Sequence, residues 1–197
     1  MSEIWAIILA AGASIRMKRQ KLLLPFNGKT IIETVVENVA QSVNSNIMVV
    51  LGSHREQIQK QIVNYPVKFC VNENYMDGML SSVICGFRAL PGEVKAALIF
   101  LGDQPQIPST VTDLVIKAWI QSKKGIIMPT FNGRRGHPVL IETRYKTEIE
   151  RLDSEKGLRV LAEKFKDDVQ EVECNIPEIL RDIDTPEEYE YEINKNQ

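Results

Sequence analysis

The stretch Leu9–Lys21, LAAGASIRMKRQK, combines the residue types that proteins use to hold phosphate groups. Its first residues are small, and Arg16, Lys18, Arg19 and Lys21 then follow within six positions. Small residues let the backbone approach a ligand closely, successive N–H groups can bind an anion, and Arg16 and Lys21 could neutralise phosphate oxygens. The alternative is a solvated turn in front of an ordinary basic helix, and the spacing alone favours neither interpretation.

Two further stretches place aspartates where a divalent cation could bind. Asp103 follows the apolar run AALIFL within Gly-Asp-Gln-Pro, a position suited to a metal-binding carboxylate or to an ordinary turn. Asp182 and Asp184 flank Ile183 just before a predicted helix, where an aspartate often only stabilises a turn or the helix dipole. We expect the two side chains to point in opposite directions, so that at most one of them reaches Asp103.

A fourth stretch, NGRRGH at 132–137, carries two arginines and a histidine between two apolar runs. Asn-Gly between such runs predicts a β-hairpin, and we expect a bulge or an extension because the polar loop exceeds two residues. His137 alone is typical of a structural role, but Arg134 and Arg135 beside it could clamp an anion.

Two familiar phosphate-binding motifs are excluded by the sequence. It contains no G-x-G-x-x-G, so a dinucleotide-binding fold is unsupported. Gly28-Lys29-Thr30 resembles the end of a P-loop, but that motif requires another glycine where the chain has Leu23. We therefore interpret residues 28–30 as a turn and a helix start.

Short, continuous apolar strands alternate with amphipathic helices along the whole chain, which predicts a three-layer α/β/α sandwich around a mostly parallel sheet. We expect strands at 4–10, 46–52, 67–72, 95–102, 125–131, 138–143 and 168–174, and helices at 29–42, 54–64, 80–90, 109–121, 144–151, 157–166 and 186–193. No linker or repeat interrupts this pattern, so residues 1–197 are expected to form a single domain. Ligands of open α/β sheets bind beyond the carboxyl ends of the strands, so we expect Asp103, Asp184 and the bend at 12–21 to converge.

The composition bounds the class of protein. The 197 residues are 44% hydrophobic and 25% charged, with 24 basic and 26 acidic side chains and a net charge of -2. This near balance argues against nucleic acid or a membrane surface as a partner. Three cysteines without a CxxC pair, no signal-type segment and no long apolar run predict a cytoplasmic protein with reduced thiols.

The four stretches together resemble the signature of the molybdenum cofactor nucleotidyltransferases, the MobA-like NTP transferases. LAAGASIRMKRQKLLLP is similar to their LAAG-x-S-x-RMG-x-x-K-x-LLP motif, and GDQP, GRRGHP and DIDTPEEY match further motifs in order. The resemblance spans essentially the whole chain. It implies a Rossmann-like nucleotidyltransferase fold, shared with nucleotide-diphospho-sugar transferases, with a β-hairpin insertion.

The resemblance also implies roles for particular residues. Arg16, Lys21 and Asp103 would be catalytic, Asp103 and Asp184 would bind Mg²⁺, and the hairpin would face the acceptor. The implied nucleotide-binding residues are Leu9, Ala10, Ala11, Gly12, Ala13, Ser14, Arg16, Lys21, Ser81, Ser82 and Asp103, and the implied acceptor-binding residues are Arg134, Arg135, Gly136 and His137. Ser81 and Ser82 could instead cap a helix.

Through the same resemblance, Ala11 indicates which nucleobase the transferred nucleotide carries. Guanylyl-transferring relatives usually carry LAGG where this chain has LAAG, so the resemblance points to transfer of CMP from CTP to molybdopterin, whose product serves molybdoenzymes of the xanthine dehydrogenase type. Lys18 departs from the family glycine, and it would either add a phosphate contact or mark a differently shaped loop with an altered substrate. The alternatives are transfer from GTP or to another phosphorylated acceptor, and a non-catalytic accessory protein that delivers cofactor to a molybdoenzyme.

Overall fold

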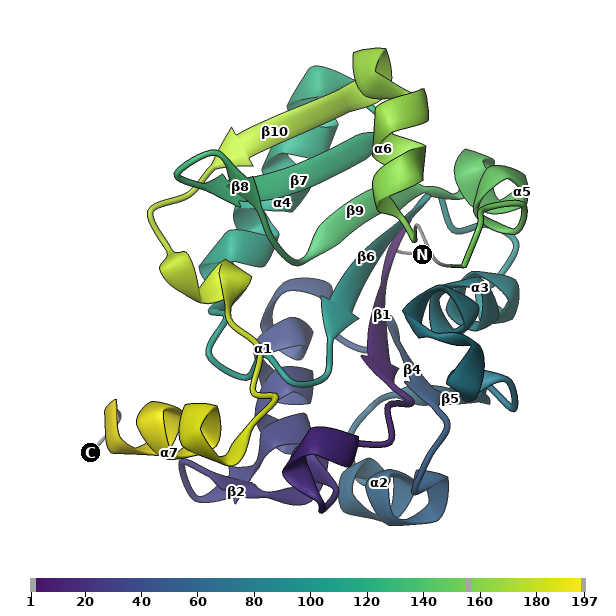
Figure 1. Cartoon of the computed structure of the whole chain (residues 1–197). Coiled ribbons are helices and arrows are strands. Elements are labelled where there is room, and N and C mark those ends of the chain that lie inside the picture. The colour runs from purple at the N-terminus through teal and green to yellow at the C-terminus, as the bar shows by residue number, and fades with distance from the viewer. Residues whose placement is uncertain (1–2, 155–156, 196–197) are drawn as a thin grey trace.

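A computed structural model describes residues 3–154 and 157–195 of the chain. Its centre is an eight-stranded sheet in the order β10-β7-β9-β6-β1-β4-β5, with β8 paired to β7 (Figure 1). The strands are β1 Ile4–Ala10, β4 Ile47–Leu51, β5 Lys68–Val71, β6 Ala96–Leu101, β7 Ile126–Phe131, β8 Arg134–Arg135, β9 Val139–Glu142 and β10 Val169–Glu173. The strands β2 Pro25–Phe26 and β3 Lys29–Thr30 form a separate small hairpin.

The sheet is mostly parallel, as predicted. β1 pairs in parallel with β4 and β6, β4 with β5, and β7 with β10. β9 is inserted antiparallel between β6 and β7, because the chain reverses direction after β7 and returns along its edge. The central strand β1 is buried along nearly its whole length, which explains its unbroken apolar sequence.

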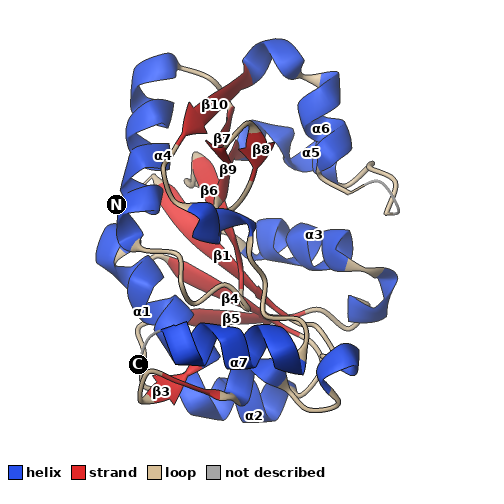
Figure 2. Ribbon diagram, turned by 60° about the vertical axis from the view of Figure 1, so that its left-hand side comes forward, coloured by secondary structure: helices blue, strands red, loops and turns tan. Residues whose placement is uncertain are grey.

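Helices cover both faces of the sheet, which confirms the three-layer prediction (Figure 2). The helices are α1 Ile31–Val43, α2 Arg55–Ile62, α3 Met79–Ala89, α4 Ser109–Ser122, α5 Lys146–Ile149, α6 Arg159–Lys164 and α7 Pro186–Lys195. Alternate residues of β1 point into two separate cores, one shared with α1, α2, α4 and α7, the other with α3, α5 and α6. No helix in the described part of the chain is long and apolar enough to cross a membrane.

Two helix starts follow from local side-chain chemistry. Thr30 and Glu33 form a reciprocal capping box at the start of α1. Thr185 and Glu188 do the same at the start of α7, where the Glu188 N–H donates to Thr185 Oγ1 over 3.2 Å and Glu188 Oε2 accepts from the Thr185 N–H over 2.9 Å. The second box confirms the prediction for this helix, and it places Asp184 just outside the helix.

The hairpin after β7 is tighter than expected. Phe131 pairs with Arg134, which leaves Asn132 and Gly133 as a two-residue loop with φ of 51° and 72°. Positive φ at both positions is the type I′ geometry that Asn-Gly favours, so the loop at the tip has only two residues. The expected bulge is present farther from the tip: Thr130 pairs with Arg135 and Ile127 with Leu140, so the returning strand carries two more residues than β7 between these pairs. Gly136 lies in this bulge and packs so closely against Ile179 that a Cβ atom would clash with its carbonyl oxygen.

Candidate functional site

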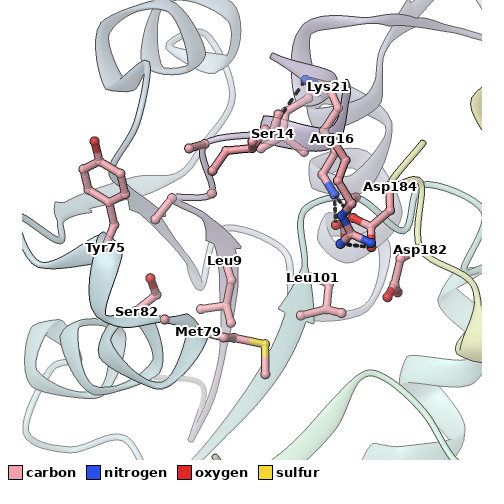
Figure 3. Close-up of a pocket in the computed structure, with 17 residues that line it drawn as sticks. Leu9, Ser14, Arg16, Lys21, Tyr75, Met79, Ser82, Leu101, Asp182 and Asp184 are labelled. Atoms are coloured by element: carbon pink, nitrogen blue, oxygen red, sulfur yellow. Dashed lines mark hydrogen bonds and ion pairs between the residues drawn. The ribbon is translucent and has the colours of Figure 1, made fainter. Parts of the chain in front are cut away.

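A cavity of about 460 Å³ lies beyond the carboxyl ends of β1 and β6 (Figure 3). Its lining residues are Leu9, Ala11, Gly12, Ala13, Ser14, Ile15, Arg16, Lys21, Leu22, Tyr75, Gly78, Met79, Ser82, Leu101, Asp103, Asp182 and Asp184. They come from the loop after β1, the segment before α3, the end of β6 and the segment before α7. This size suits a small-molecule ligand, and the place is the one where open α/β sheets bind theirs.

The loop after β1 curls over the cavity because two of its residues adopt a left-handed backbone conformation. Ser14 has φ 52° and Lys18 has φ 54°, and a 3₁₀ turn at Ile15–Met17 lies between them. Met17 is buried and anchors this turn to the core, while Arg16 projects from it. Lys18 occupies the family's glycine position, and its left-handed conformation supplies the physical reason why glycine suits that position.

Gln20 connects the beginning and the end of this loop, although no motif in the sequence assigns it a role. Its side chain is buried; Oε1 accepts from Ser14 Oγ over 2.8 Å and from the Leu22 N–H over 3.3 Å. Nε2 donates to the Gly12 carbonyl oxygen over 3.3 Å. A glutamine among basic residues carries no sequence signal for burial, so only the fold reveals this contact.

Lys21 joins the loop to two aspartates that come from distant parts of the chain. Its Nζ donates to Oδ2 of Asp103 and, over 2.7 Å, to Oδ1 of Asp184. Arg16 Nη2 donates to Oδ2 of Asp184 over 2.6 Å. The C-terminal segment before α7 runs back beside the N-terminal loop, which makes these contacts possible (Figure 1). The predicted convergence of Asp103, Asp184 and the 12–21 bend is confirmed.

The electrostatics of the cluster favour its charged state. Burial by itself would lower the pKa of Lys21, but Asp103 and Asp184 raise it above its ordinary value. Burial likewise acts to raise the pKa of Asp184, yet hydrogen bonds and attraction from Lys21 and Arg16 hold it below its usual range. Lys21 and Asp184 therefore stabilise each other's charge, and Asp103 and Arg16 are their further partners in the cluster.

Asp182 also lines the cavity, and the expectation that at most one of the aspartates would reach the Asp103 site is wrong. Residues two apart in an extended segment share a face, so Asp182 and Asp184 both face the cavity while Ile183 is buried on the other side. Burial and repulsion from Asp103 raise the pKa of Asp182 to about 6, although Gln104 donates a hydrogen bond to it over 2.7 Å.

Most residues implied for nucleotide binding line this cavity, but two do not. Ala10 is buried in the core beneath the loop. The hydroxyl group of Ser81 already makes hydrogen bonds within the protein: it accepts from Asn72 Nδ2 over 2.8 Å and donates to the carbonyl oxygens of Gly78 and Asn74. The helix begins at Met79 with Gly78 as its cap, so neither Ser81 nor Ser82 is the capping residue. The nucleotide contacts of the lining residues stay predictions.

The residues implied for acceptor binding do not line the cavity. Arg134 and Arg135 are exposed on β8, and Arg135 Nε donates to Glu171 Oε1 over 2.7 Å. Gly136 packs against Ile179. His137 is only partly exposed, its Nδ1 lies 3.3 Å from the Ile99 carbonyl oxygen, and burial lowers its pKa. Their contact with an acceptor stays a prediction.

The carboxylates at the cavity suit a hard cation such as Mg²⁺, which prefers oxygen ligands and usually combines one or two carboxylates with phosphates and water. Oδ1 of Asp103 is buried without a hydrogen-bond partner and so keeps its lone pairs available. Within the described ranges, no three histidine, cysteine or acidic side chains form a ready-made metal site. A cation here would therefore complete its shell with oxygens from a ligand.

Comparisons with known proteins agree with this geometry. A sequence profile described as the MobA-like NTP transferase domain matches residues 6–170. The chain is 30% identical to the molybdenum cofactor cytidylyltransferase of Escherichia coli over 190 residues, which is 96% of this chain and 95% of that protein. It is 26% identical to the nicotine blue oxidoreductase of Paenarthrobacter nicotinovorans, with 92% of each chain covered.

The fold is found in solved structures as well. The structure of Rv0371c from Mycobacterium tuberculosis in complex with manganese superposes with a TM-score of 0.80, at 22% identity, over 98% of this chain and 99% of that one. At this identity the likeness establishes the fold, and it matches the three layers described above.

Proposed function

The chain belongs to the MobA-like NTP transferase family, and from this premise we propose that it transfers CMP from CTP to the terminal phosphate of a molybdopterin-type acceptor. The observation that carries the proposal is the cluster of Arg16, Lys21, Asp103 and Asp184 inside one cavity at the carboxyl ends of β1 and β6. The likeness to the molybdenum cofactor cytidylyltransferase of Escherichia coli, which extends over nearly the full length of both chains, supports the choice of nucleotide and acceptor.

The proposed reaction is an in-line displacement. An oxygen of the acceptor phosphate forms a bond to the α-phosphorus of CTP, the bond from this phosphorus to the bridging oxygen breaks, and its electrons leave with pyrophosphate. An acceptor phosphate is already ionised near neutral pH, so the reaction requires no strong general base. It requires alignment and the neutralisation of negative charge.

The residues around the cavity can meet both requirements. Arg16 and Lys21 would neutralise oxygens of the triphosphate, and the backbone N–H groups of the small residues after β1 would hold it in place. Asp103 and Asp184 would hold Mg²⁺. When bound, this cation supplies positive charge to the phosphate oxygens and lowers the barrier to displacement. One protein with the same fold has been solved in complex with manganese.

Ala11 supports the choice of a pyrimidine base. It is 4% exposed and lines the cavity, and a Cβ on neighbouring Gly52 would lie 2.7 Å from its methyl group. Its methyl group therefore packs against Gly52, and we expect the residue at position 11 to set how closely the loop after β1 approaches the base. Replacing Ala11 by glycine should lower the preference for CTP over GTP by about tenfold, the lower end of what one methyl group contributes in a packed pocket.

The experiment that tests the function measures pyrophosphate release and incorporation of radiolabelled nucleotide. The purified protein is mixed with Mg²⁺, with molybdopterin extracted from a purified molybdoenzyme, and with CTP, GTP, ATP or UTP in separate reactions. We expect incorporation with CTP in preference to GTP, and Asp103→Asn serves as the inactive control. Preference for GTP would contradict the choice of base.

The same experiment separates the remaining classes of function. A protein that binds molybdopterin but releases no pyrophosphate with any triphosphate would act as a carrier for a molybdoenzyme. Because one relative is named as an oxidoreductase, the absence of nucleotide transfer would also turn attention to redox chemistry. Incorporation of the nucleotide into another phosphorylated compound, but not into molybdopterin, would support nucleotidyl transfer as the reaction and contradict molybdopterin as the acceptor.

A further inference from the structure

We propose that Lys21 occupies the cation position between Asp103 and Asp184 in the substrate-free protein, and that a divalent cation enters only together with a triphosphate that draws Lys21 away. The proposal rests on the function proposed above, because it takes the cavity to bind a nucleoside triphosphate with its metal. It concerns how the site is regulated: metal and nucleotide bind as a coupled pair, and neither alone binds well.

The contacts of the two carboxylates provide the first argument. Oδ2 of Asp103 and Oδ1 of Asp184 both accept hydrogen bonds from Lys21 Nζ. Oδ2 of Asp184 accepts one from Arg16. The fourth oxygen, Oδ1 of Asp103, is buried and has no hydrogen-bond partner. A metal ion that arrives alone between Asp103 and Asp184 therefore meets accessible oxygens that are already bound to cations.

Burial makes this ion pair costly to break. The Lys21 side chain is 12% exposed and that of Asp103 is 18% exposed, so water screens their attraction much less than at the surface. A cation that took the place of the ammonium would leave Lys21 beside a double positive charge, without a replacement partner. The wild-type site therefore excludes a lone divalent cation.

A triphosphate reverses this balance. It brings negative oxygens to the loop that carries Arg16 and Lys21, so both side chains can exchange a carboxylate for a phosphate. Arg16 is 69% exposed and can make this change without leaving a packed environment. The freed oxygens of Asp103 and Asp184 then face a cation that also binds the phosphates. Positive and negative groups remain paired before and after the exchange.

The direct test is a titration of the nucleotide-free protein with Mn²⁺. The electron paramagnetic resonance signal of free Mn²⁺ measures how much of the cation is bound. Removal of the ammonium in Lys21→Met should tighten Mn²⁺ binding by about tenfold or more. The double variant Lys21→Met/Asp103→Asn should lose this gain, because it removes one of the two carboxylates that pair with Lys21. Lys95→Met is the matched control, since Lys95 pairs with the single exposed carboxylate Glu3 and its removal should leave Mn²⁺ binding unchanged.

Equal Mn²⁺ affinity in wild type and Lys21→Met would overturn the proposal, and so would a gain that persists in the double variant. Lys21→Met leaves Asp103 without its cation and Asp184 with Arg16 alone, and the variant could fail to fold, so a second measurement uses the wild type alone. Mn²⁺ alone should leave its thermal unfolding midpoint unchanged, whereas Mn²⁺ with a non-hydrolysable CTP analogue should raise it by more than the sum of the two separate effects. An equal rise with Mn²⁺ alone would refute the exchange.

Failure of this proposal and failure of the proposed function are distinguishable. The Mn²⁺ titration requires neither an acceptor nor turnover, so it reports only on Lys21 and the two aspartates. If the protein transfers CMP but binds Mn²⁺ tightly without nucleotide, the proposed function stands. The proposed replacement of Lys21 by the metal ion is then wrong.

Discussion

The loop at residues 9–21 and the hairpin at residues 132–137 look alike in the sequence and differ in the structure. Each follows a buried strand and combines small residues with at least two arginines or lysines. The loop directs Arg16 and Lys21 into a shared cavity, where they contact two aspartates. The hairpin leaves its arginines exposed on β8, outside that cavity.

The difference arises from what each segment meets in space. The segment before α7 returns to the end of β1 and brings Asp184 opposite Arg16 and Lys21. At the hairpin, β10 lies on the other edge of β7 and offers Glu171 to Arg135. Basic residues at a strand end therefore indicate an anion site only where the fold leaves a cavity in front of them.

The largest expected effect concerns the loop and its partners. Asp103→Ala and Lys21→Ala should each lower the rate of nucleotide transfer at least tenfold, and by about 10²–10³ if each removes a full transition-state interaction. The rate of pyrophosphate release checks this, with circular dichroism to confirm that both variants are folded. Normal turnover in folded Asp103→Ala would show that this carboxylate has no role in the reaction. The loop and the hairpin would then no longer differ in the way described above.

A smaller effect is expected from the buried side chain that supports the loop. Gln20→Leu should raise the KM for CTP by about tenfold and lower the free energy of unfolding by about 1–3 kcal/mol, because Gly12, Ser14 and Leu22 lose a hydrogen-bond partner. Steady-state kinetics and urea denaturation measure the two quantities.

Gln106→Leu provides the matched control for this variant. Gln106 donates to the Arg181 carbonyl oxygen over 2.7 Å and does not line the cavity. It should lower stability without changing the KM. If both variants changed the KM equally, Gln20 would have no special relation to the nucleotide loop.

The two arginines of the hairpin should behave differently from each other. Arg134 is exposed and can meet an acceptor that extends beyond the cavity, so Arg134→Ala should raise the KM for the acceptor several-fold. Arg135 is already paired with Glu171, so Arg135→Ala should change the free energy of unfolding by only about 0.2–1 kcal/mol. Steady-state kinetics at varied acceptor concentration measure the effect of Arg134→Ala on this KM. An unchanged KM would take the hairpin out of acceptor binding.

A small effect on stability alone is expected from backbone strain in the loop. Lys18 has φ 54°, a conformation that costs a non-glycine residue about 1–2 kcal/mol. Lys18→Gly should therefore stabilise the protein by about 0.5–1 kcal/mol once the entropy of glycine is counted. Thermal and chemical unfolding of the two proteins measure this difference. A loss of stability instead would mean that the Lys18 side chain makes a contact worth more than the strain.

Several features were predictable because they depend on neighbours in the sequence. The unbroken apolar run of β1 predicts a strand buried on both faces, and Thr185 with Glu188 predicts the start of α7. The shared direction of Asp182 and Asp184 also follows from the period of two in an extended segment, and our expectation that they point in opposite directions misapplied this period. The tight Asn132-Gly133 turn likewise follows from local backbone preferences.

The alternation of strands and helices, the caps, and the strand ends that carry charged residues follow from the order of the amino acids, since these features depend on contacts a few residues apart. Which charges meet depends on the packing of segments that are distant along the chain. Lys21 lies 82 positions from Asp103 and 163 from Asp184, and the three side chains come together because β1 and β6 are neighbours and the chain returns beside them before α7. The burial of Gln20 and the pairing of Arg135 with Glu171 have the same origin, because each depends on packing between segments whose distance in space no local pattern encodes.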